Sequence, residues 1–176
     1  MTAVALTLRL ALAFVLVAAV VGKLRSRTSR AEYRQMFTAL DVPAPWRTPV
    51  AVALVAAETV TAALLPFPST AIAGSAMAAA LFGVLAAGVH HIVRGARHVK
   101  CNCFGGASDA ELSTLHVVRN AALVAGAVAA LVLSIPGGTL TTPGIVTAGA
   151  AALVFTILVV RLDDLVYLTS DDSARR

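Results

Sequence analysis

The sequence predicts an all-α protein that crosses a membrane several times as a helix bundle. Of the 176 residues, 59% are hydrophobic and 13% are charged, which is about half of the charged share usual in a soluble domain. A globule of this length cannot bury so much apolar surface in one core, and disordered chains are poor in apolar residues. The apolar residues fall into five long runs, and unbroken runs of about 20 residues favour membrane-spanning helices over strands.

Five spans are expected, and polar side chains mark the first three. The spans cover residues 4–21, 49–65, 70–93, 115–135 and 144–160. The first contains Arg9, which is expected to extend to the outer membrane interface. The second contains Glu58, and the third ends at His90 and His91. Because five basic residues directly follow the first span, we expect it to be retained as an anchor rather than cleaved as a signal peptide.

The basic residues alternate between connecting segments. Six Lys and Arg residues lie between the first and second spans, none lies in residues 66–69, and three follow the third span before the fourth begins. Residues 136–143 again contain none. Because basic loops stay on the cytoplasmic side, the N-terminus is predicted outside and the C-terminus in the cytoplasm. The net charge of +5 therefore indicates contact with anionic membrane lipid; no nucleic-acid recognition motif accompanies it.

The segment between the first two spans has a pattern of its own. A capping box, Ser29 to Glu32, predicts a helix over about residues 30–40 with Ser29 as its N-cap. Apolar residues then recur at helical spacing: Tyr33, Met36, Phe37 and Leu40. This pattern predicts a short amphipathic helix on the membrane surface. It is expected to end at residues 42–46, with Trp46 at the interface.

Both cysteines of the chain lie in one loop, residues 99–108, as Cys101 and Cys103. A disulfide between such close neighbours is strained, and a strained disulfide is easily reduced, which suits thiol exchange. Two unrelated thiols or one inert disulfide remain alternative interpretations. The spacing lacks the two-to-four-residue gap typical of zinc sites, so no metal is expected. A second capping box predicts that the fourth helix begins near Asp109.

Polar residues from several spans are expected to surround the cysteines at one membrane face. They are Lys23, Arg47, His90, His91, Arg94, Arg97, His98, His116, Arg119 and Asn120. Positive charge favours the thiolate, which is the attacking species. Cys101 and Cys103 are therefore the candidate catalytic residues.

Glu58 joins this supporting set. An unpaired carboxylate in the middle of a span is costly, so Glu58 is expected to face the bundle interior. Its candidate partners are Arg9, Lys23 and Arg119. A structural bond between helices, a proton relay and a quinone contact all remain open.

On these residues the sequence resembles the methylamine utilisation protein MauE family, a branch of the DoxX-like membrane proteins. The matching residues are Gly22-Lys23-Leu24, Glu58, Cys101-Asn102-Cys103-Phe104-Gly105 and Arg119-Asn120. The resemblance covers about residues 5–135 and implies a four-helix core, to which the fifth C-terminal span is an addition or a variant end. It also implies thiol–disulfide work beside a thioredoxin-like partner, during maturation of a disulfide-rich methylamine dehydrogenase subunit.

The expected function is therefore a membrane thiol–disulfide redox protein that forms one domain over residues 1–176, with a membrane quinone as the candidate cofactor. One conflict stays open, because disulfide maturation belongs outside the cytoplasm whereas the basic loops place the cysteines inside. A first alternative is a non-catalytic subunit that anchors or stabilises a larger complex. A second is a small proton-coupled transporter in which Glu58 binds the proton.

Overall fold

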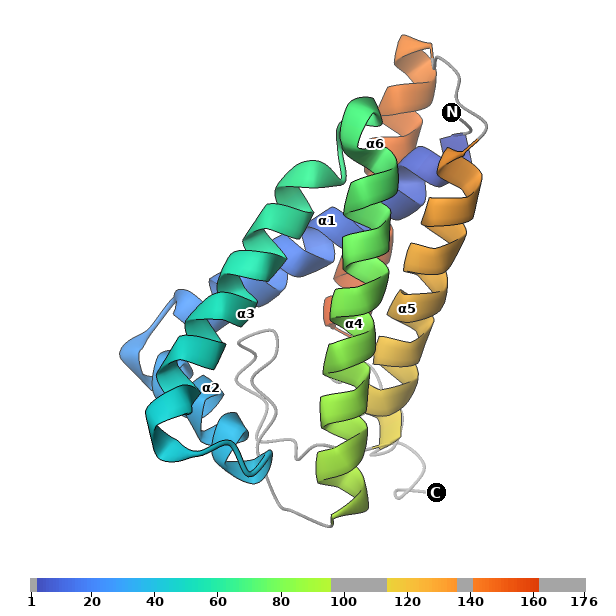
Figure 1. The fold of residues 1–176 in the computed structure, drawn as a ribbon. Helices are drawn as coiled ribbons and strands as arrows, with labels where there is room; N and C mark the ends of the chain where they lie inside the picture. Colours follow the sequence, from blue (N-terminus) through green and yellow to red (C-terminus); the bar gives the residue numbers. More distant parts are fainter. Residues whose placement is uncertain (1–2, 96–113, 136–140, 162–176) are drawn as a thin grey trace, which may run out of the picture.

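The computed structural model describes residues 3–95, 114–135 and 141–161. Within these ranges the protein is all helical, with six α-helices and one short 3₁₀-helix (Figure 1). They are α1 (Ala3–Leu24), α2 (Arg27–Ala39), α3 (Ala44–Leu64), η1 (Pro68–Thr70), α4 (Ala71–Arg94), α5 (Thr114–Ser134) and α6 (Thr142–Val160). Five of these segments are long and apolar enough to cross a membrane. The predicted fold class is confirmed.

The central helix of the bundle is α1, which packs against α3, α5 and α6. In Figure 1, α4 and α5 run side by side, while α1 and α3 lean away from them toward α2. Alanines without any exposed surface lie in the core, including Ala78 and Ala127. Small residues let helix backbones approach closely, which is how helices associate when lipid removes the hydrophobic driving force between them.

Large apolar side chains cover much of the outside of the bundle. Val84 and Val146 are about two-thirds exposed, and Val132 and Phe155 are also exposed. In water such a surface would favour aggregation, but in a bilayer it faces hydrocarbon.

The second helix begins earlier than the capping box suggests. The N-cap of α2 is Ser26, whose Oγ accepts a hydrogen bond from the backbone N–H of Ser29 at 2.9 Å. Ser29 itself lies inside the helix, so its predicted role as the cap is wrong. An N-cap oxygen bonds the N–H two or three residues later, and the run of serines and threonines from Ser26 to Ser29 offers more than one such pairing.

The third helix also begins earlier, at Ala44 rather than near Pro49. Pro45 lies in its first turn, where the missing N–H has no helical partner to lose. Trp46 is therefore part of α3 and not of a connecting segment, and it is 62% exposed. Pro43 and Pro45 therefore open α3.

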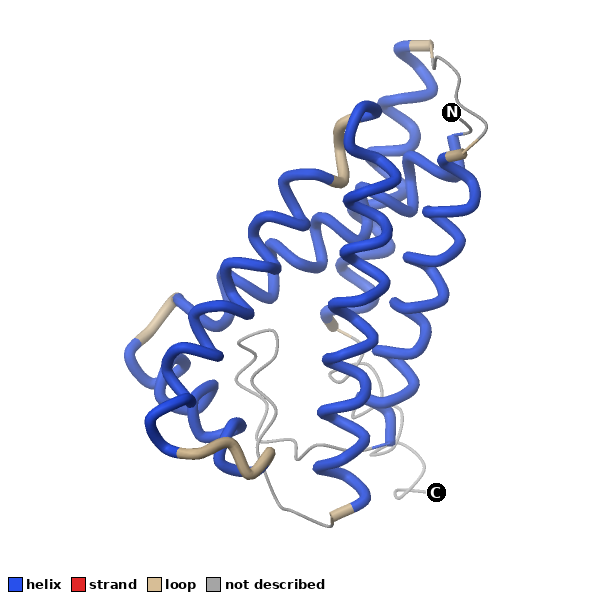
Figure 2. The backbone as a smooth tube through the Cα atoms, in the orientation of Figure 1, coloured by secondary structure: helices blue, strands red, loops and turns tan. Residues whose placement is uncertain are grey.

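The amphipathic α2 packs against α1 and the first half of α3 at one end of the bundle (Figure 2). Its apolar side chains form a second buried cluster with Ala51 of α3 and Ile92 of α4. Within it the rings of Tyr33 and Phe37 meet edge to face, with centroids 5.2 Å apart, a favoured aromatic geometry. This arrangement places Tyr33 beside the last turn of α1.

Candidate functional site

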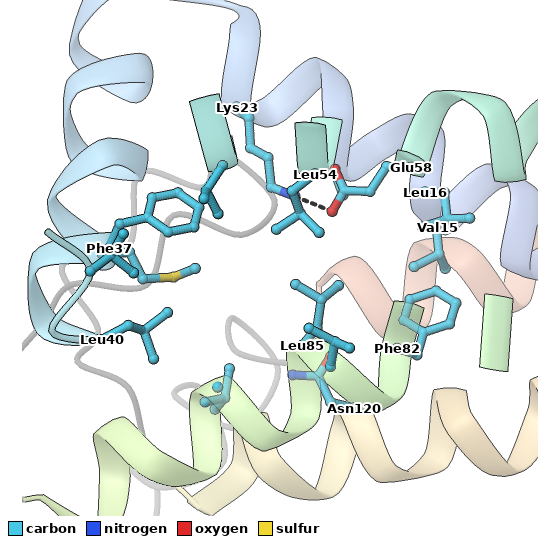
Figure 3. Close-up of a pocket in the computed structure, with 17 residues that line it drawn as sticks. Val15, Leu16, Lys23, Phe37, Leu40, Leu54, Glu58, Phe82, Leu85 and Asn120 are labelled. Carbon is cyan, nitrogen blue, oxygen red and sulfur yellow. Dashed lines mark hydrogen bonds and ion pairs between the residues drawn. The ribbon is translucent and has the colours of Figure 1, made fainter. Parts of the chain in front are cut away.

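A buried ion pair joins α1 to α3. The Nζ of Lys23, in the last turn of α1, donates a hydrogen bond to Oε1 of Glu58 (Figure 3). The two side chains are 3% and 0% exposed. Of the three candidate partners of Glu58, the structure selects Lys23, because α1 and α3 pack together with these residues in register.

Two further features shape the environment of this pair. The Lys23 ammonium lies 4.9 Å from the centroid of the Tyr33 ring, which is within the range of a cation–π interaction. The other carboxylate oxygen, Oε2 of Glu58, is buried and has no hydrogen-bond partner among the described residues. A buried acceptor without a partner is costly, so this oxygen is suited to accept a hydrogen bond from a bound molecule.

The pair lies at the edge of a partly open cavity of about 200 Å³. Its walls are mainly apolar and come from α1, α2, α3, α4 and α5, with Leu16, Phe37 and Phe82 among them (Figure 3). Of the described residues that line it, only Lys23, Glu58 and Asn120 are polar. A concave, mainly apolar space with a few convergent polar groups is the usual form of a small-molecule site.

One face of α5 turns polar residues into the bundle. His116, Arg119 and Asn120 are all buried, as their spacing along one helix face allows. Asn120 lines the cavity, opposite the Lys23–Glu58 pair in Figure 3. This polar face therefore contributes directly to the site.

The last turns of α4 behave differently. His90, His91 and Arg94 are exposed, and none of them lines the cavity. The structure thus divides the expected cluster of basic groups: Lys23 and the α5 residues face inward, whereas those three residues lie on the outer surface of α4.

Arg9 is fully buried within the protein, and its expected position at the outer interface stays a prediction. Its Nε donates to the carbonyl of Leu65 and its NH2 donates to the carbonyl of Phe67, both at 2.7 Å. The last carbonyls of a helix lack partners within it and carry partial negative charge, so the bond to Leu65 satisfies the end of α3, while the bond to Phe67 joins Arg9 to the connection between α3 and η1. Spacing within α1 gave no signal of this long-range contact.

The cysteine segment lies outside the described residues. This applies to Cys101 and Cys103, to their neighbours Arg97, His98 and Lys100, and to the predicted helix start near Asp109. Among the residues that the structure does describe, no group of three or more His, Cys, Asp or Glu side chains could hold a metal ion.

Comparison with known proteins gives one family match. The model of the family described as "Methylamine utilisation protein MauE" matches residues 1–133. This range contains α1 to α4 and nearly all of α5, whereas α6 lies beyond it. Neither the curated proteins nor the solved structures compared with the chain include a match.

Proposed function

Since the chain belongs to the MauE family and has five candidate membrane spans, we propose that this multi-pass membrane protein exchanges electrons between Cys101 and Cys103 and a thioredoxin-like partner. The observation that carries the proposal is the position of the cysteine pair in the segment that joins α4 to α5. The described ends of these helices bear basic side chains, namely Arg94, His116 and Arg119. Nearby positive charge lowers the cost of forming a thiolate.

The exchange proceeds through a mixed disulfide. A thiolate of the partner attacks one sulfur of the Cys101–Cys103 disulfide, forming a bond between the proteins and releasing the other cysteine as a thiolate. The partner's second thiolate then attacks the mixed disulfide. The partner loses two electrons and becomes a disulfide, while the chain gains two electrons and, with two protons, becomes a dithiol. Such an oxidised partner could then pass its disulfide to a maturing protein.

The cavity supports a quinone as the acceptor that restores the disulfide. A quinone and a dithiol convert to a hydroquinone and a disulfide, with two electrons and two protons transferred. A cavity of about 150 Å³ can hold benzene, so 200 Å³ accommodates one ring. Lys23 would donate a hydrogen bond to a quinone carbonyl, and Oε2 of Glu58 would accept one from the hydroxyl of the reduced form.

The test uses the full chain reconstituted in lipid with a reduced thioredoxin-like protein, whose remaining thiols are counted by alkylation and mass shift. We expect the wild type and the Asn102→Ser control to oxidise the partner, and the Cys101→Ser/Cys103→Ser variant to be inactive. Unchanged oxidation by the double variant would reject the proposal, whereas a wild type that leaves the partner reduced would favour a non-catalytic subunit of a larger complex.

The side of the membrane is tested separately. A membrane-impermeant thiol reagent applied from each side, with and without reductant, reports the orientation and the redox state of the cysteines together. Because the chain has two cysteines, every labelled site belongs to this pair. The basic loops predict labelling from the cytoplasmic side.

A further inference from the structure

A groove of about 490 Å³ lies between α2 and α3 and is lined by other residues than the cavity described above. Its two walls differ in character. One wall is cationic and carries Arg27, Arg30 and Arg34 of α2. The other is largely apolar and includes Val52 and Val55 of α3.

The cationic wall follows from the periodicity of α2. Residues 27, 30 and 34 are three and four positions apart and therefore share one helix face. All three arginines are exposed, and none of them pairs with a carboxylate among the described residues, where the one ion pair joins Lys23 to Glu58. Arg30 and Arg34 each donate Nε to a backbone carbonyl one turn earlier, at 3.2 and 3.4 Å. These bonds hold the side chains along the helix and leave their terminal nitrogens available.

The apolar wall belongs to a helix that can cross the membrane. Val52 is 63% exposed there, and Leu24, at the end of α1, is 48% exposed. The groove thus combines basic groups from a surface helix with apolar groups from a spanning helix. A soluble anion would use only the first wall, and an uncharged hydrocarbon chain would use only the second.

From this combination we propose that the groove binds one anionic phospholipid. The headgroup phosphate lies among Arg27, Arg30 and Arg34, where guanidinium groups donate paired hydrogen bonds to phosphate oxygens. One acyl chain lies along Val52 and Val55. The described residues that line the groove differ from those that line the Lys23–Glu58 cavity, although Tyr33 of the groove contacts Lys23.

The test uses the single tryptophan of the chain, Trp46, which is two positions before the groove residue Thr48. The full chain is reconstituted in vesicles that contain phosphatidylcholine and a fraction of phosphatidylglycerol. One of the two lipids carries brominated acyl chains, which quench tryptophan fluorescence on contact. The wild type is expected to be quenched preferentially by brominated phosphatidylglycerol.

The variant Arg30→Gln/Arg34→Gln should lose this preference by roughly fivefold for each arginine, the value of one basic residue at an anionic surface. Arg161→Gln, at the end of α6, removes a basic residue elsewhere and should retain the preference. Helix content by circular dichroism verifies that each variant is folded. The proposal would be overturned if the folded double variant kept the wild-type preference for phosphatidylglycerol. It would also be overturned if Arg161→Gln lost this preference to the same extent as the double variant. Displacement of the brominated lipid by inorganic phosphate alone would instead show a site for soluble anions.

Discussion

Replacing Lys23 by Met is expected to destabilise the folded bundle by about 3–5 kcal/mol, the usual cost of removing one member of a buried ion pair. Both side chains are almost completely buried, so water cannot solvate the charge that remains. Glu58 would lose the bond to Oε1, while Oε2 already lacks a partner among the described residues. For a protein of this size, a loss of 3–5 kcal/mol lowers the unfolding temperature by roughly 6–20 °C.

The same reasoning predicts strong coupling between the two residues. Glu58→Leu should also destabilise the bundle, because it leaves the Lys23 ammonium buried without its carboxylate. The double variant Lys23→Met/Glu58→Leu should be far more stable than the sum of the two losses predicts, since apolar side chains can replace a buried pair at little net cost.

The assay is reversible unfolding in mixed detergent micelles, followed by helical circular dichroism for the wild type, both single variants and the double variant. Arg25→Met is the control, because Arg25 is exposed two positions after Lys23. A coupling energy below about 0.5 kcal/mol, the limit within which independent sites add, would refute the reasoning. A decrease in unfolding free energy of less than about 1 kcal/mol for both single variants would also refute it, because a decrease of that size is typical of exposed ion pairs.

Three further predictions use the same unfolding measurement. Arg9→Met should destabilise the bundle by about 1.5–3 kcal/mol for each of the bonds to the carbonyls of Leu65 and Phe67; a neutral effect would show that water or lipid replaces these bonds. Gly74→Ala should destabilise by about 1–3 kcal/mol, because its Cβ would lie 3.1 Å from the backbone of α3. A Cβ added at Gly83 would have no atom within 4 Å, so Gly83→Ala should instead stabilise the bundle by about 0.5–1 kcal/mol. Equal changes in unfolding free energy for the two glycine variants would contradict this packing. Ser26→Ala should cost about 1 kcal/mol through loss of the α2 cap, whereas the exposed Thr28→Ala should be nearly neutral.

The helix boundaries illustrate how far local patterns reach. The apolar runs located all five candidate spanning helices. The start of α3 differs from the predicted one because proline is compatible with the first turn of a helix as well as with the end of the preceding one. The N-cap of α2 is Ser26 and not the predicted Ser29, because several neighbouring hydroxyl residues could act as the cap. The extended backbone of Ser26 distinguishes it from the others.

The candidate site shows a different limit. The sequence indicated that Glu58 needs a partner and that His116, Arg119 and Asn120 share a helix face. It did not indicate that Asn120 lines the same cavity as the Lys23–Glu58 pair. Cys101 and Cys103 remain a prediction, because they lie outside the described residues.

The sequence by itself determined the class of protein, the number of candidate spans and the existence of an amphipathic helix between the first two. These properties belong to single segments, since hydropathy, length and periodicity are read along one stretch of chain. Tertiary structure alone decided that Glu58 pairs with Lys23, that Arg9 satisfies α3, and that α2 and α3 enclose a groove. Each of these depends on where two helices cross and on their relative rotation, which helix–helix packing sets and neither helix specifies alone.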